Sequence, residues 1–306
     1  MGSAGLITLA RQVVTLKATR AQQWPYFSGS KLRGAFGQAL KESSCITRAP
    51  TCDQCPILRS CPYGEVFESV PIHQLTFDHP VHGSYNQRPP AILFNSAAAA
   101  KHLDNGDQVR FEVVLLSDAM RFLPIIENTW ARAVPALSTP PGGLELVSVK
   151  LLPTEVLNTE SQGGEGNIAE VALNFESPVR IQSRNQILRK VEDLTAQVLL
   201  MAAVQRVAQI LETRFNASSG SIAFSSLTAA AKQCRLSGQL QWQDLKRYSN
   251  RQHRHIPLGG FVGPVRLTGN LAPFLPYLRI CEAIHLGKET TFGLGRFKIL
   301  TSLPTT

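Results

Sequence analysis

The sequence lacks any run of about 18 uninterrupted apolar residues, which is the length that a membrane-spanning helix requires. It also has no basic segment ahead of the apolar stretch within residues 1–10, so a secretory signal is not expected. Charged residues are few, at 17%, whereas hydrophobic residues make up 43%, which is enough to bury a substantial core. These features predict a folded cytoplasmic protein with no membrane partner.

The positive charge of the chain is distributed unevenly. The 306 residues suit two domains of ordinary size and carry a formal net charge of +9. Residues 231–306 hold 7 Arg and 4 Lys against 3 acidic residues, a net of +8. A basic surface confined to one domain attracts a polyanion by counterion release, and nucleic acid is the usual one. A solvated basic surface explains the same charge, so charge alone leaves both interpretations open.

The hydrophobic pattern of the first half predicts the element order β-α-β-β-α-β. Alternating apolar residues indicate strands, and apolar residues three and four apart indicate helices. The strands are expected at residues 6–17, 90–94, 107–116 and 144–152, and the helices at residues 30–40 and 120–133.

A polar, glycine-rich stretch at residues 158–167 then marks a domain boundary, after which the same order is expected again. Ser183 and Gln186 have the spacing of a capping box and predict the start of a long helix. The strands are expected at residues 168–175, 235–243, 260–268 and 296–300, and the helices at residues 183–215 and 271–283. The predicted fold is therefore α+β, with two tandem ferredoxin-like (RRM-like) domains at residues 1–157 and 158–306.

A cysteine-rich insertion is expected in the first domain, at about residues 44–67. Its cysteines are Cys45, Cys52, Cys55 and Cys61. The Cys-x-x-Cys pair brings two thiolates to one metal ion, and two further sulfurs complete the closed coordination of a structural zinc site. Unligated thiols and an iron–sulfur cluster, which uses the same ligands, are the alternatives.

A glycine-rich segment at residues 287–297 precedes the last expected strand. Gly287, Gly293 and Gly295 allow backbone N–H groups to approach a phosphate, and Lys288 and Arg296 add charge. A turn that requires positive φ is the alternative interpretation. The segment is not a Walker loop, because no Gly-Lys-Ser/Thr follows at the required spacing.

A second basic segment, at residues 246–255, combines arginines with an aromatic residue. Arg247, Arg251 and Arg254 can bind phosphate bidentately, and Tyr248 offers a stacking surface to an unpaired base. A solvated loop would have the same composition, so the segment alone does not decide between them.

Four segments in this order resemble a known family. They are FSGSKLRGAFGQAL from Phe27, CDQCPILRSCPYGEVFE from Cys52, RYSNRQHRHIPLGGFVG from Arg247 and HLGKETTFGLGRF from His285. The chain resembles the CRISPR-associated repeat-RNA-processing endoribonucleases of the RAMP (repeat-associated mysterious protein) superfamily, in a branch with a four-cysteine insertion. The resemblance implies tandem ferredoxin-like domains, binding of CRISPR repeat RNA, and one metal-independent cut that releases guide RNAs.

The reaction implied by this resemblance is attack of a ribose 2′-hydroxyl on its own phosphate, which leaves a 2′,3′-cyclic phosphate. It requires a general base, a general acid and cations near the phosphorane charge. Many relatives carry a catalytic His in or beside the first strand–helix connection, whereas no His precedes His73 here. Tyr26, Lys31 and Arg33 occupy that connection instead.

The expected catalytic residues are therefore His285 or His255 as the base, with Lys288 and an arginine stabilising the transition state and Tyr26 contributing to charge stabilisation. The expected RNA-binding residues are Lys31, Arg33, Arg247, Arg251, Arg254, Gly287, Gly293, Gly295 and Arg296.

A non-catalytic RNA-binding RAMP subunit of a CRISPR effector complex is the alternative. The missing early histidine favours that subunit, and the complete cysteine and glycine segments favour the enzyme.

Overall fold

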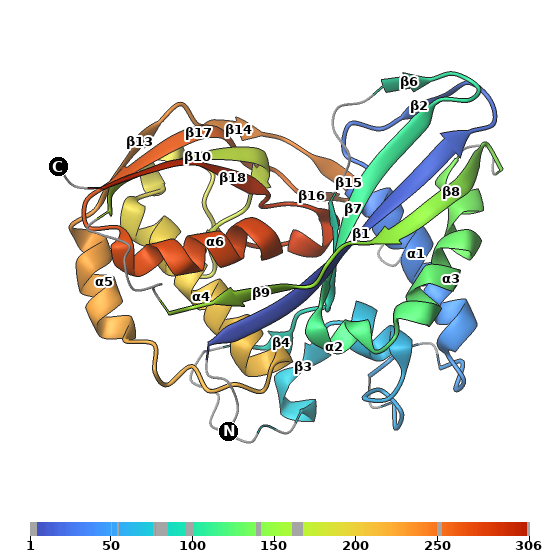
Figure 1. Ribbon diagram of the computed structural model, residues 1–306, viewed down its shortest axis with the longest axis horizontal. Helices are drawn as coiled ribbons and strands as arrows, with labels where there is room; N and C mark the ends of the chain where they lie inside the picture. The colour runs from blue at the N-terminus through green and yellow to red at the C-terminus, as the bar shows by residue number, and fades with distance from the viewer. Residues whose placement is uncertain are drawn as a thin grey trace.

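The computed structural model describes residues 5–49, 51–53, 55–75, 77, 85–95, 101–138, 142–160, 168–249 and 253–304. In its first half, β1 (Leu6–Ala18) pairs antiparallel with β7 (Gln108–Leu116) and β8 (Leu144–Leu151), and β5 (Ile92–Asn95) pairs with β7. The strand order β5-β7-β1-β8 is that of a ferredoxin-like sheet. The helices α1 (Gly29–Ser44) and α3 (Leu123–Ala133) pack against it, on the right of Figure 1.

Aromatic side chains fill the core of this first domain. Trp130 of α3 lies 4.8 Å from Phe36 of α1 and 5.2 Å from Phe111 of β7, measured between ring centroids. Phe94 of β5 completes the cluster at 5.4 Å from Phe36. Such pairs add to the stabilisation from buried area, so this cluster fixes both helices on the sheet.

The second half repeats the arrangement, on the left of Figure 1. Its sheet has the order β13-β17-β10-β18, and it packs with two helices. The elements are β10 (Ile168–Val179), α4 (Ala196–Arg214), β13 (Arg235–Gly238), β17 (Gly260–Thr268), α6 (Leu275–Ile284) and β18 (Phe297–Pro304). Two tandem ferredoxin-like domains are thus confirmed.

The predicted helix at residues 183–215 is wrong in its first third. β11 (Gln182–Ser183) and β12 (Gln186–Ile187) form a hairpin, and its turn residues Arg184 and Asn185 have φ of 48° and 63°. Two consecutive residues with positive φ are typical of a tight hairpin turn, so Ser183 and Gln186 pair across strands and do not cap a helix. α4 begins instead after Thr195, whose Oγ1 accepts a hydrogen bond from the Val198 N–H at 3.3 Å.

Further elements were not expected from the sequence. The expected strand at 235–243 is broken at Gly238 (φ 156°) into β13 and β14 (Gln241–Gln243), and the helix α5 (Phe224–Lys232) lies before it. The strands β15 (Lys246–Ser249) and β16 (Arg254–Pro257) form a hairpin that precedes β17. The remaining elements are β2 (Gln22–Trp24), β3 (Val70–Pro71), β4 (Gln87–Arg88), β6 (Lys101–Leu103), α2 (Ser117–Met120) and β9 (Glu155–Asn158), with short helical turns at Tyr63–Phe67, Ile72–Gln74, Val134–Leu137, Val191–Asp193, Ala272–Phe274 and Thr290–Phe292.

Side chains of α4 join the two domains. Arg214 donates from Nε to the Pro89 carbonyl at 2.7 Å and from Nη1 to the Glu65 carbonyl at 2.8 Å. Gln209 donates from Nε2 to the Gln87 carbonyl at 3.1 Å. The domains are therefore held together by directed hydrogen bonds as well as by packing. Among the described residues, no helix is both long and apolar enough to span a membrane.

Candidate nucleic-acid interface

The start of α1 meets the glycine loop, residues 287–295, at the junction between the domains. A Cβ added to Gly29 would lie 1.8 Å from the Phe292 carbonyl oxygen, so only glycine permits this approach. Gly287, Gly293 and Gly295 have φ of 90°, 82° and 77°. The loop glycines are thus required by the backbone itself, whether or not the loop also binds phosphate.

Two arginines from different domains share one aromatic ring at this junction. The Arg33 Cζ lies 4.9 Å and the Arg247 Cζ 4.6 Å from the centroid of the Phe292 ring. Arg33 also lies over Phe67, at 4.1 Å, and donates from Nη2 to the Phe67 carbonyl at 3.3 Å. The aromatic faces attract both cations and hold them near each other despite their like charge.

These two guanidinium groups keep hydrogen-bonding capacity. The Nε atoms of Arg33 and Arg247 are buried and have no hydrogen-bond partner among the described residues. Burial lowers the pKa of Arg33, and the nearby Glu68, Tyr63 and Glu289 oppose this effect. Two close guanidinium groups to which no carboxylate of the described residues is hydrogen-bonded are suited to a phosphodiester, which arginine can bind bidentately.

Three residues at the start of α1 border the arginines. Ser28 is fully buried, and its Oγ has no hydrogen-bond partner among the described residues. Lys31 is half-buried, and this burial lowers its pKa. Tyr26 is 48% exposed. The positive end of the helix dipole adds to the attraction that this region exerts on an anion.

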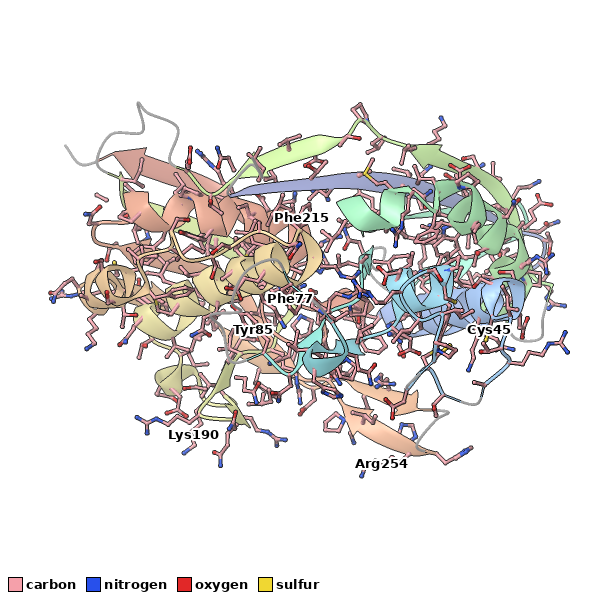
Figure 2. All side chains as sticks on the ribbon, turned by 90° about the horizontal axis from the view of Figure 1, so that it is seen from below. Cys45, Phe77, Tyr85, Lys190, Phe215 and Arg254 are labelled. Atoms are coloured by element: carbon pink, nitrogen blue, oxygen red, sulfur yellow. The ribbon has the colours of Figure 1, made fainter. Side chains whose placement is uncertain are left out.

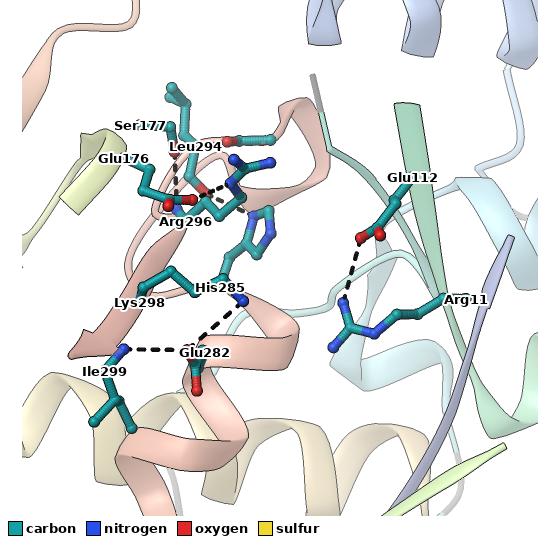
Figure 3. Close-up of polar contacts among 11 residues, drawn as sticks. Arg11, Glu112, Glu176, Ser177, Glu282, His285, Leu294, Arg296, Lys298 and Ile299 are labelled. Carbon is teal, nitrogen blue, oxygen red and sulfur yellow. Dashed lines mark hydrogen bonds and ion pairs between the residues drawn. The ribbon is translucent and has the colours of Figure 1, made fainter. Parts of the chain in front are cut away.

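His285, a predicted base, lies inside the second domain. It is 1% exposed, and its Nδ1 lies 3.1 Å from the Leu294 carbonyl oxygen (Figure 3). Burial, followed by the charge of Arg296, lowers the pKa of His285 to about 3, so the ring is neutral at physiological pH. The neutral Nδ1–H donates to Leu294 and ties the end of α6 to the glycine loop. The ring therefore has almost no exposed surface in this structure.

The two cations predicted in the glycine segment differ in their surroundings. Arg296 is paired with Glu176, with 2.7 Å between Nε and Oε2, and its backbone N–H donates to the Ser177 Oγ at 2.8 Å (Figure 3). The side chain of Lys288 is exposed to solvent. Its pKa is lowered, first by partial desolvation from the surrounding protein and then by the charge of Arg206. Lys288 is therefore the more available of the two for a phosphate.

The β15–β16 hairpin carries the second basic segment. In Figure 2 the hairpin that bears Arg254 projects from the lower edge of the molecule. Arg254 and His255 are exposed on β16, and Arg247 pairs with Ile256 across the hairpin. Arg251 lies outside the described residues. The hairpin thus brings Arg247 to the glycine loop and leaves His255 open to solvent.

The cysteines lie beyond the end of α1. The Sγ atoms of Cys45 and Cys55 are each 3.8 Å from the Thr47 Oγ1, and burial raises the pKa of Cys52 to about 11. Cys61 is buried. Among the described residues, no group of three or more His, Cys, Asp or Glu side chains is arranged to hold a metal ion. The zinc site therefore stays a prediction.

Phe292 and Ser28 were missed as functional residues in the sequence. Phe292 lies inside the glycine segment, where an aromatic residue among glycines is the signal that could have been used. For Ser28, which is buried with an unpartnered Oγ among the described residues, the sequence offers no comparable signal.

Comparisons with known proteins agree with this architecture. Residues 7–162 match a family model described as an N-terminal domain, and residues 173–297 match the model of the CRISPR-associated endoribonuclease Cas6. No curated protein sequence matches significantly.

Several solved structures share the fold. Thermus thermophilus Cas6 is 12% identical, with 96% of this chain and 99% of that chain covered and a TM-score of 0.54. A Cas6 product complex is 17% identical, with 96% and 100% covered and a TM-score of 0.53. A partial Cas6-RT-Cas1--Cas2 complex is 13% identical with a TM-score of 0.56; it covers 98% of this chain, which spans only 48% of that longer chain. Residues 173–297 thus resemble the CRISPR-associated endoribonuclease Cas6, and the chain shares the two-domain fold of the Cas6 structures.

Proposed function

We propose that this protein cuts precursor CRISPR RNA once within each repeat and so releases guide RNAs. The family match supports this function, and the pair of arginines on Phe292 is the observation that carries it. The pair joins the two domains at a point where the first helix, the glycine loop and the hairpin meet. An RNA strand that crosses this junction would contact all three.

The proposed chemistry is attack of a ribose 2′-hydroxyl on the adjacent phosphorus. The 5′-oxygen of the next nucleotide leaves with a proton, and a 2′,3′-cyclic phosphate remains on the upstream product. Negative charge builds on the non-bridging oxygens, where Arg33 and Arg247 are suited to stabilise it. These two guanidinium groups supply fixed positive charge, so we expect cleavage to proceed without a metal ion.

Among the two candidate histidines, we assign direct proton transfer to His255. It is exposed on the hairpin that also carries Arg247, whereas His285 is buried. Lys31 has a lowered pKa and can act as the complementary proton donor. His285 becomes a positioning residue, because its hydrogen bond holds the glycine loop against the end of α6.

Single-turnover cleavage of the cognate repeat RNA in EDTA tests the proposal. We expect one cut, a product mass that corresponds to a cyclic phosphate, and no cut when deoxyribose replaces the ribose 5′ of the scissile phosphate. His255→Ala should slow the chemical step by about 100-fold or more, the range of general acid–base catalysis. Cleavage that is unchanged in His255→Ala refutes the assignment of the base.

The arginine pair needs its own comparison. Arg33→Gln and Arg247→Gln should each lower the single-turnover rate, whereas Arg132→Gln, an exposed position on α3, should not. Equal rates in all three variants would remove the junction from the mechanism.

A non-catalytic RNA-binding subunit of a CRISPR effector complex is the second candidate. The absence of a histidine from residues 19–28, which join β1 to α1, favours it. Tight binding of repeat RNA with no cut under the same conditions would support this candidate and reject the enzyme.

A further inference from the structure

A cleft of about 940 Å³ opens between the two domains. The segment that includes Tyr85 and Gln87 lines it from the first domain, and α4 and the β11–β12 hairpin line it from the second. It shares residues 287–291 of the glycine loop with the junction described above. Figure 2 places Tyr85 near the middle of the molecule, beside α4.

Arg206 of α4 lines this cleft as a buried cation, and Glu289, beside Lys288, is the acidic residue of the lining. Arg206 is 8% exposed, and its Nη2 donates to the Thr290 Oγ1 at 3.0 Å and to the Ile284 carbonyl at 3.5 Å. Its Nε is buried without a hydrogen-bond partner, and no carboxylate of the described residues pairs with the group. A buried cation normally has a paired anion, so the site is suited to an anionic ligand.

The rest of the lining has the character of a nucleotide site. Lys288 and Arg184 add positive charge at the rim. Tyr85 and Phe224 are half-buried aromatic residues that offer stacking surfaces to a base. The amide side chains of Asn86, Gln87, Gln182, Asn185, Gln205 and Gln209 also line the cleft, and amides can both donate to and accept from the edge of a base.

We propose that this cleft binds a nucleoside phosphate, with the phosphoryl group at Arg206 and Lys288 and the base against the aromatic and amide side chains. The ligand is a free mononucleotide or one nucleotide of a bound RNA strand, because both present the same chemistry. The volume lies in the range of small-molecule sites and exceeds what a bare phosphate would fill. This inference does not depend on the proposed cleavage.

Gln205 provides a test that spares the core, because it is exposed on α4 and lines the cleft. Gln205→Glu places a negative charge beside the proposed phosphate without a change in size, and Gln205→Ala removes the amide without adding charge. Titration calorimetry of the full chain with adenosine 5′-monophosphate, adenosine and inorganic phosphate measures the affinity, and thermal melting confirms that the variants fold.

Adenosine 5′-monophosphate should bind more tightly than adenosine or phosphate alone. Gln205→Glu should weaken it by about tenfold and Gln205→Ala by much less, as expected for one close charge repulsion. If only a short single-stranded RNA binds, and Gln205→Glu weakens that binding more than Gln205→Ala, the ligand is a strand nucleotide. Binding that is equal in the two variants, or absent for both ligands, overturns the proposal.

Cleavage of repeat RNA is measured on the same preparations. A wild-type protein that binds the nucleotide but cuts no RNA would reject the proposed enzyme and leave this site intact. A protein that cuts RNA but binds nucleotide independently of Gln205 would reject the nucleotide site and leave the proposed enzyme intact.

Discussion

The buried ring of His285 makes the stability of the second domain depend on pH in a defined way. Burial and the charge of Arg296 lower the pKa of His285 to about 3 in the folded state, whereas an unfolded chain has a histidine pKa of about 6.5. Below pH ~6.5 the unfolded state binds a proton that the folded state does not, so stability falls as pH falls and levels off below pH ~3. Above pH ~6.5 both states are neutral, and this dependence disappears.

The size of the effect follows from the shift. Each pH unit well between the two pKa values costs about 1.4 kcal/mol, so acidification from pH 6.5 to 4.5 removes roughly 2 kcal/mol through this residue. His285→Asn keeps an N–H donor for the Leu294 carbonyl, and, because the backbone here has φ 62° and ψ 154°, the comparison rests on the pH slope and not on absolute stability. The variant therefore loses the titration and retains the hydrogen bond.

Urea unfolding, followed by tryptophan fluorescence at several pH values, gives the comparison. The free energy of unfolding of the wild type should fall more steeply below pH 6.5 than that of His285→Asn, and the difference in slope should approach 1.4 kcal/mol per pH unit. The other titrating groups are common to both proteins and cancel in the difference. Identical slopes would mean that the ring takes up a proton in the folded protein, and the buried, neutral assignment would fail.

Four further predictions follow from the junction and the insertion. Burial lowers the pKa values of Arg33, Arg180 and Lys288, and the negative charge of Glu289 opposes this effect at all three. Glu289→Gln should therefore strengthen RNA binding in a filter assay by a few fold, because it removes a negative charge from among these cations. Weaker binding would contradict the place of Glu289 among them. Gly29→Ala should destabilise the protein by about 1–3 kcal/mol, because the Cβ meets the Phe292 carbonyl, whereas Gly34→Ala in the same helix meets open space and should be neutral or stabilising in urea unfolding. Lys288→Ala should reduce the salt dependence of RNA binding by about one unit of slope, and Arg296→Ala by less because of its pairing with Glu176; equal effects would refute the distinction. Metal analysis should find one zinc per chain, lost in the Cys52→Ser and Cys55→Ser double variant together with a lower melting temperature; a metal-free wild type would exclude the zinc site.

Local patterns in the sequence were sufficient for most of the fold. The alternation in residues 107–116 and the helical spacing from Leu32 to Leu40 each reflect burial on one face, which is a property of neighbouring residues. Ser183 and Gln186 misled because polar residues three apart suit a hairpin as well as a capping box. Only the positive φ of the two residues between them decides, and the sequence does not show it.

The candidate site was predictable in its parts and not in its assembly. The basic and glycine segments were identified as residues of interest, and Arg33 and Arg247 both lie at the junction. Their meeting on Phe292 depends on the packing of two domains, which no local pattern records. The burial of His285 was hidden for the same reason, since its hydrogen bond goes to Leu294 of the glycine loop and the charges of Arg206 on α4 and Arg11 on β1 act on it.

Three hydrogen bonds that α4 directs to the first domain end on main-chain oxygens, those of residues 65, 87 and 89. Every amino acid supplies such an oxygen, so side-chain replacements at these three positions leave the acceptors in place. These hydrogen bonds between the domains depend on the side chains of the donors, Gln209 and Arg214. Substitutions at residues 65, 87 and 89 of the first domain therefore keep these three hydrogen bonds, as long as Gln209 and Arg214 of the second domain are retained.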